Sequence, residues 1–142
     1  MTEHTTDKKI ETMTKECLYT ALLLLMEKKP YEDITITEIA KKAGVSRMSY
    51  YRLYKSKDDI LEQYADEVFR NLLNRIREMQ NPDKKWLAEE LFRICGENHL
   101  LLKNVYHAKL YDRIMKNLIQ YCGYLAEHVF GMEQSPETEY WI

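Results

Sequence analysis

The sequence predicts an all-α protein, because two features of the chain favour helices over strands. Only 4 of its 142 residues are glycine and 3 are proline, so few positions interrupt regular structure. Apolar residues recur at spacings of three and four, and strand-like alternation is almost absent. The 45% hydrophobic and 31% charged residues are typical of a globular chain that buries a core. The length suits one domain or two small helical units, and it excludes a barrel enzyme or a two-domain dehydrogenase.

The first helix is expected from about Asp7 to Lys28, with Pro30 ending it. Its apolar residues fall on one face and predict a single buried stripe, made of Ile10, Met13, Cys17, Leu18, Ala21, Leu22 and Leu25.

Two short helices follow, separated by a tight turn. Thr35 and Glu38 have the spacing of a capping box, which predicts the start of the second helix. Gly44 stands where a left-handed residue ends a helix, and Ser46 is a good N-cap for a third. Two short helices around a glycine-containing turn form a helix-turn-helix.

Four more helices are expected beyond this motif. Ser56 caps a long fourth helix that runs to about Gln80, before the break at Asn81-Pro82-Asp83. The fifth is marked by Trp86 to Ile94, the sixth covers Leu100 to Tyr106, and the seventh carries Leu110 to Val129.

Charge is segregated along the chain, although the net charge is only −2. Between Thr35 and Lys57 six basic residues stand against one acidic residue, whereas from Asp58 onward 10 basic residues stand against 15 acidic ones. A short basic segment on an otherwise acidic chain is typical of a patch that binds a polyanion.

The segment from Thr35 to Lys57 therefore fits DNA binding, in which a helix presents its side chains to base edges in the major groove. The alternative is a helix-turn-helix that serves packing alone. DNA binding is favoured because the polar residues of the third helix point away from its anchors Val45, Tyr50 and Tyr54. Arg47 and Arg52 are the best candidates for guanine contacts, followed by Ser49 on the same helix and Thr37 on the second. The helix starts at Thr35, Ser46 and Ser56, and the basic Lys55, are candidates for phosphate contacts.

Residues 35–46 (TITEIAKKAGVS) and 50–61 (YYRLYKSKDDIL) resemble the TetR/AcrR family of bacterial transcriptional regulators. The resemblance covers about Lys8 to Tyr64, and the remainder is similar only in its helix pattern. It implies that the third helix reads the groove, that Tyr51 touches a phosphate and that Lys57 binds the DNA backbone.

Two residues depart from the family pattern. Met48 stands where the family commonly has a small residue or proline, and it is a candidate for apolar contact with a thymine methyl group. Leu53 replaces the usual histidine or tyrosine, which removes one phosphate contact.

The resemblance also implies two domains: a helix-turn-helix domain over residues 1–57, and a helical regulatory and dimerisation domain over residues 58–142. A small effector would bind among the helices of the second domain. The candidate lining of its pocket is aromatic and apolar, and it consists of Phe69, Phe92, Tyr106, His107, Met115, Tyr121, Cys122 and Tyr124. The alternative is that these residues are ordinary core.

Catalysis, a cofactor and a metal site are not expected. The chain has no glycine-rich phosphate loop, no HExxH and no GxSxG, and paired carboxylates such as Glu89-Glu90 fit solvated helix faces. His99 and His107 lack metal-ligand spacing. The three cysteines form no CxxC and are interpreted as reduced core thiols of a cytoplasmic protein. The run Ala21–Met26 is too short for a membrane helix, and the polar start is unlike a signal peptide.

The predicted function is therefore a homodimeric regulator, acting as a repressor, that binds a palindromic double-stranded operator under control of a small molecule. Family members are typically longer, so the chain is expected to lack the last helices, with residues 139–142 beginning an eighth. The alternative is a helical interaction module, or a truncated regulator that sequesters a partner. The operator, the regulated genes, the effector and the choice between repressor and activator lie outside the sequence.

Overall fold

The computed structural model describes residues 2–79 and 83–128, and all regular elements within these ranges are helical. The predicted all-α class is confirmed. Observed helix ends lie close to the predicted ones, except that the first helix begins well before Asp7; the predicted eighth helix lies outside the described residues. The elements are α1 (Thr2–Met26), the 3₁₀ turn η1 (Tyr31–Asp33), α2 (Ile36–Ala43), α3 (Arg47–Leu53), α4 (Asp58–Glu78), α5 (Lys84–Glu97), α6 (His99–His107) and α7 (Tyr111–His128).

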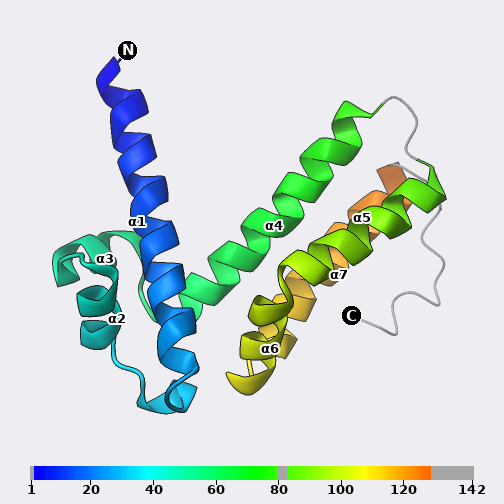
Figure 1. Ribbon diagram of the computed structural model, residues 1–142. Coiled ribbons are helices and arrows are strands. Elements are labelled where there is room, and N and C mark those ends of the chain that lie inside the picture. Colours follow the sequence, from blue (N-terminus) through cyan, green and yellow to red (C-terminus); the bar gives the residue numbers. More distant parts are fainter. Residues whose placement is uncertain (1, 80–82, 129–142) are drawn as a thin grey trace.

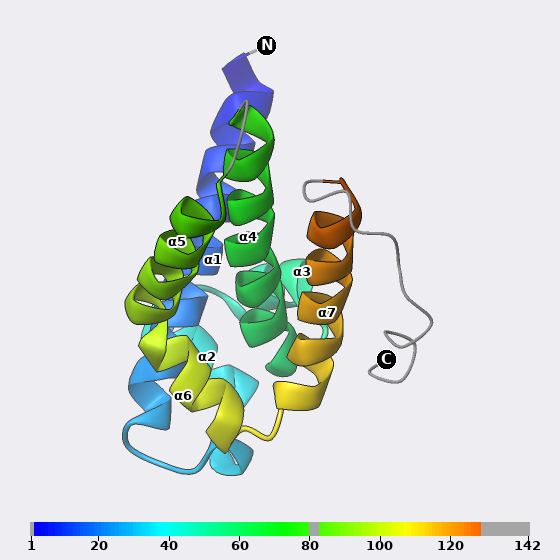
Figure 2. The same ribbon diagram turned by 90° about the vertical axis from the view of Figure 1, so that its right-hand side faces the viewer.

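The helices form two groups (Figure 1). We call α1 to α3 the head; α2 and α3 lie on one side of α1, and α4 to α7 lie on the other. α4 leaves the head obliquely, α5 runs back in the opposite direction, and α7 runs alongside α4 (Figures 1 and 2). α6 lies beside the C-terminal half of α1, where the chain turns between α5 and α7.

One hydrophobic core joins the head to the helices that follow it. Leu18 and Leu22 of α1 and Tyr50 of α3 are fully buried, and they belong to the same cluster as the buried residues of α4, α6 and α7. The members beyond the head are Ile60, Leu61, Ala65, Leu101, Val105, Leu110 and Ile114. The predicted domain boundary at residues 57 and 58 therefore does not divide the packing.

A second, smaller cluster lies at the far end of α4. Leu72, Leu73 and Ile76 pack with Leu125 of α7, and partly buried aromatic and aliphatic side chains of α5 and α7 surround them. Arg77 lies over the ring of Tyr124, 5.0 Å from its centroid.

The predicted stripe of α1 is buried only in the second half of the helix. Ile10 and Met13 are 54% and 56% exposed, because the first half of α1 extends past α2 and none of the described helices covers this face (Figure 1). Cys17, at the edge of the covered part, is also exposed. The prediction that the three cysteines are core thiols was wrong, since Cys95 and Cys122 lie on the solvent faces of α5 and α7 as well.

Glu90 also differs from its predicted solvated position, because it is only 5% exposed. Its carboxylate pairs with Arg75 of α4 and with Arg93, whose Nη2 lies 2.6 Å from Oε1. The hydrogen bond from Arg93, with the charge of Arg75, lowers the pKa of Glu90 and keeps it ionised. A buried carboxylate needs such partners, so this cluster fixes α5 against α4.

Candidate nucleic-acid interface

The start of α2 is held by the predicted capping box. The Thr35 hydroxyl accepts from the Glu38 N–H at 3.2 Å, and Glu38 Oε2 accepts from the Thr35 N–H at 2.9 Å. Lys29 donates to the other oxygen of Glu38 at 2.6 Å. These contacts, that of Lys29 foremost, lower the pKa of Glu38 to about 2. The end of α1 is thereby tied to the start of α2.

The turn and the start of α3 also form as predicted. Gly44 has φ 71°, in the left-handed region that favours glycine, and the Val45 N–H donates to the Ala40 carbonyl at 3.0 Å. The Ser46 hydroxyl accepts from the Ser49 N–H at 3.0 Å. The helix-turn-helix therefore follows from local sequence chemistry.

Buried tyrosines set the orientation of α3. Tyr50 is fully buried and Tyr54 is 4% exposed, with their ring centroids 5.9 Å apart. The rings of Tyr51 and Tyr50 form a T-shaped contact, and Tyr51 remains 51% exposed. Because these anchors face the core, the opposite face of α3 faces solvent.

The predicted base-contacting residues lie on or beside this solvent face, which we call the reader face (Arg47, Met48, Tyr51 and Arg52). All four are exposed, and Met48 is 84% exposed. Thr37 is exposed on α2. Ser49 is half-buried, and its hydroxyl lies 3.0 Å from that of Ser46, so it serves the cap as well.

The predicted phosphate contacts differ in how free their polar groups are. Lys55 has an exposed side chain, and Tyr51 belongs to the reader face. The Thr35 hydroxyl is engaged twice, since it also donates to Glu38 at 2.8 Å. Ser56 exchanges hydrogen bonds with Asp59, through its N–H at 3.0 Å and its hydroxyl at 3.4 Å. α4 itself begins at Asp58, so Ser56 caps it from two residues earlier.

Lys57 was predicted to bind the DNA backbone, but its side chain makes contacts within the protein. Its ammonium group donates to the carbonyl oxygens of Tyr31, Glu32 and Ile34 at 2.5, 3.1 and 3.0 Å. It also lies over the Tyr31 ring, 4.4 Å from the centroid. All three ammonium protons are used, so a phosphate contact would require the side chain to leave these carbonyls. No sequence signal pointed to this, because the partners are backbone atoms far away in the chain.

We therefore expect Lys57→Ala to lower the free energy of unfolding by about 1–3 kcal/mol, because three carbonyls lose a charged donor. Lys55→Ala, a matched loss of charge from an exposed neighbour, should change it by less than about 0.5 kcal/mol. Urea unfolding of both variants measures the difference. Equal stability, with DNA affinity lost only in Lys57→Ala, would instead assign Lys57 to a phosphate.

The head carries a basic surface around the reader face. Lys41 and Lys42 at the end of α2, with Arg47, Arg52 and Lys55, are all exposed. Within the described residues none of these five side chains forms an ion pair, so their charges remain available to an anionic partner. This arrangement suits the phosphate backbone of a duplex.

The eight predicted pocket residues are not gathered around one cavity. Phe92 and Tyr106 are 80% and 70% exposed, and His107, Met115 and Cys122 are exposed too. The other three are partly buried, with Phe69 beside Tyr121 at 5.7 Å between centroids. Phe92, Tyr106 and Met115 are exposed because α5, α6 and α7 each carry apolar side chains on a face that points to solvent.

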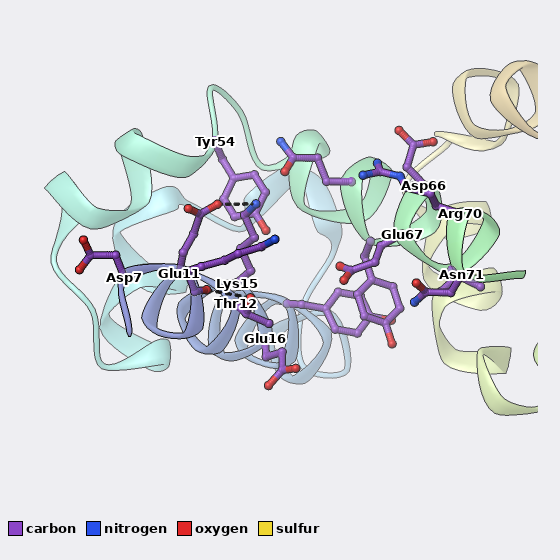
Figure 3. A pocket seen from close by; sticks show the side chains of 15 residues that line it. Asp7, Glu11, Thr12, Lys15, Glu16, Tyr54, Asp66, Glu67, Arg70 and Asn71 are labelled. Carbon is purple, nitrogen blue, oxygen red and sulfur yellow. Dashed lines mark hydrogen bonds and ion pairs between the residues drawn. The ribbon is translucent and has the colours of Figure 1, made fainter. Parts of the chain in front are cut away.

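A cavity lies elsewhere, as a groove of about 920 Å³ between the first half of α1 and α4 (Figure 3). Its lining includes the stacked rings of Tyr19 and Tyr64, with centroids 3.6 Å apart, and charged side chains such as Glu11 and Lys15. A second cavity of about 260 Å³ lies near Glu90. None of the eight predicted residues lines either of them.

The described residues include no group of three or more histidine, cysteine, aspartate or glutamate side chains placed to hold a metal ion. None of their helices is long and apolar enough to cross a membrane.

Comparison with known families decides what the head is. Residues 18–64, from the buried half of α1 to the first turns of α4, match the family described as bacterial regulatory proteins, tetR family. The segment that holds the helix-turn-helix is therefore similar to the tetR family of bacterial regulatory proteins. This match agrees with the class predicted from the sequence, a DNA-binding transcriptional regulator, which is a non-enzymatic class of protein.

Two curated relatives are also similar to this chain. The uncharacterized HTH-type transcriptional regulator YxbF of Bacillus subtilis (strain 168) is 29% identical over 77 residues, which are 54% of this chain and 20% of the relative. An uncharacterized HTH-type transcriptional regulator of Haemophilus influenzae is 26% identical over 104 residues, 69% of this chain and 56% of the relative. The matched part of the chain thus spans about a fifth of the Bacillus subtilis relative and a little over half of the Haemophilus influenzae relative. No solved structure matches the chain.

Proposed function

We propose that this chain is a TetR-family regulator that binds a palindromic operator as a homodimer in the cytoplasm and represses transcription there. The observation that carries the proposal is the reader face, where Arg47, Met48 and Arg52 are exposed on a helix whose other side is locked into the core. In this proposal the domain of residues 1–57, which contains the head, supplies the DNA contacts, and residues 58–142 supply dimerisation and regulation.

In the proposed complex, α3 enters the major groove. The guanidinium groups of Arg47 and Arg52 have the fork geometry that pairs with the O6 and N7 atoms of guanine. Met48 offers apolar contact to a thymine methyl group, and Thr37 and Ser49 add shorter contacts at the edges. The phosphate contacts come from Lys55 and Tyr51, and from the helix starts marked by Thr35, Ser46 and Ser56.

Dimerisation follows from the geometry of a palindrome. Two reader helices must lie roughly 34–36 Å apart to meet successive major grooves. Support for a partner comes from the outward apolar side chains of the helices beyond the head, since large exposed apolar patches mark interaction surfaces. These side chains include Leu91, Phe92, Leu102, Tyr106, Tyr111, Met115 and Ile119.

Control by a small molecule is supported by the shared core. Leu101 and Val105 of α6 pack in the same cluster as Leu18 and Leu22 of α1, so a ligand that shifts α6 also shifts the head. The ligand lowers DNA affinity if it binds better to the conformation that does not fit the operator. The ligand contacts that we propose are the three predicted pocket residues that pack against the core clusters, namely Phe69 of α4 and Tyr121 and Tyr124 of α7.

The rival function is a helical module that sequesters a full-length partner without binding operators. A selection from random duplex DNA, run with light scattering, separates the two. A palindrome enriched by a dimeric protein, with log affinity falling by about 0.9 per contacted phosphate against log salt, supports the regulator. A monomer that enriches no sequence would exclude operator binding by this chain and favour the rival.

A further inference from the structure

Arg113, in the first turn of α7, bridges two carboxylates of α4. Its Nη1 donates to Asp58 Oδ2 at 3.1 Å and its Nη2 donates to Glu62 Oε2 at 3.1 Å. Its Nε lies 2.7 Å from Glu62 Oε1, an ion-pair distance without hydrogen-bond alignment. Both nitrogens of the guanidinium fork are thus used, one on each carboxylate. We call these three residues the Arg113 cluster.

The cluster continues directly into the head. The Tyr31 hydroxyl of η1 donates to Asp58 Oδ1 at 2.5 Å, so the two oxygens of Asp58 join α7 to the α1–α2 connection. Lys57, the preceding residue, holds three carbonyls of the same connection. The capping residue Thr35 follows this connection immediately. Polar contacts therefore link α7 to the α1–α2 connection, whose last residue, Ile34, is covalently followed by Thr35 at the start of the helix-turn-helix.

Apolar and polar contacts on α7 hold its first turns beside α4. Leu110 and Ile114, on either side of Arg113 in sequence, are buried in the core shared with the head. One turn further on, the Asn117 amide donates to Asp66 Oδ1 at 3.0 Å. The position of α7 is therefore well determined where Arg113 reaches across.

Two features distinguish the Arg113 cluster from an ordinary surface ion pair. An arginine in the first turn of a helix opposes the helix dipole, so local helix chemistry does not account for its place on α7. Its partners are also sheltered, since the side chains of Asp58 and Glu62 are 29% and 20% exposed. A forked contact to two partly buried carboxylates retains more of its strength than an isolated exposed pair.

We propose that Arg113 is a positioning residue for DNA binding: through Asp58 and Tyr31 it fixes the angle of the head relative to α7, and so sets operator affinity without touching DNA. This inference rests on the proposed operator binding. The angle matters because the spacing of two reader helices in a dimer depends on how each head is held against the rest of its protomer.

The first test measures operator affinity and melting temperature for Arg113→Ala. The expected result is an affinity about tenfold lower, in the usual range for coupling between sites. The melting temperature should change by less than about 4 °C, because the Arg113 side chain is itself 56% exposed and its loss leaves the apolar core around Leu110 and Ile114 intact. Arg113→Lys, which keeps the charge, should restore part of the affinity. Lys116→Ala is the matched control, since it removes a positive charge from the next turn of α7 at an exposed site.

A double-mutant cycle with Glu62→Gln then tests the contact itself. The two changes should be less than additive in their effect on affinity, because each breaks the same ion pair. Equal affinity of wild type and Arg113→Ala, or an equal loss in Lys116→Ala, would overturn the positioning role.

The second test needs no DNA. Nitroxide labels on cysteines at Lys42 of α2 and Gln120 of α7, in a variant whose three native cysteines are serine, report the distance between head and α7. Labelled protein is diluted with unlabelled protein so that only distances within one chain are seen. Arg113→Ala should broaden this distance distribution, and an unchanged distribution would overturn the inference. If the wild type binds no duplex, the proposed function fails, while this measurement still decides whether Arg113 fixes the head.

Discussion

Leu22→Ala is expected to lower the free energy of unfolding by about 2–5 kcal/mol, the largest stability effect that we predict. Leu22 is fully buried at the point where α1 meets the shared core, so truncation removes contacts with the head and with the helices beyond it together. Leu24, on the same helix, is 40% exposed and provides the matched control. Leu24→Ala should cost less than about 1 kcal/mol.

Urea unfolding followed by both circular dichroism and tyrosine fluorescence measures the effect. A single transition is expected from both probes, shifted to lower urea by Leu22→Ala, because the head and α6 share one core. Two separate transitions, with only the first sensitive to Leu22, would show that residues 1–57 fold as an independent unit.

The helix-turn-helix could be predicted because its determinants are local. The capping box of Thr35 and Glu38, the left-handed Gly44 and the N-cap Ser46 each act over three or four residues, and the structure contains all of them. The outward direction of the reader face was predictable for the same reason, since the spacing of the anchors along one short helix decides it. The roles of its residues in DNA binding remain predictions.

The errors arise where distant parts of the chain meet. Periodicity placed Ile10 and Met13 on the face of α1 that was predicted to be buried. It carried no information on where the helices that cover this face end. Glu90 has the sequence neighbourhood of a solvated residue, yet Arg75 reaches it from another helix. Lys57 binds carbonyls of a connection more than twenty residues away. The eight residues predicted for the effector pocket are not brought together, because aromatic spacing identifies a helix face but not the element that packs against it. An effector pocket in this chain stays a prediction.

The largest functional effect is expected for Arg47→Ala. Arg47 is the first residue of α3 and is exposed on the reader face, where helix-turn-helix proteins direct the N-terminal residues of the recognition helix at base edges. Loss of a forked contact to guanine should reduce affinity for the selected operator by about 1–3 kcal/mol. Affinity for a scrambled duplex should fall much less, so the ratio of the two affinities should collapse. Titration of both duplexes by fluorescence anisotropy measures this ratio.

Lys55→Ala separates base reading from charge. It removes the same charge from an exposed site beside the reader helix, so it should weaken both duplexes about equally and lower the salt slope by about 1. The salt slope of Arg47→Ala should change less, because a contact to a base displaces no phosphate counterion. If Arg47→Ala instead weakened both duplexes equally, Arg47 would be a phosphate contact, and operator specificity would have to come from Arg52 and Met48 further along the reader face.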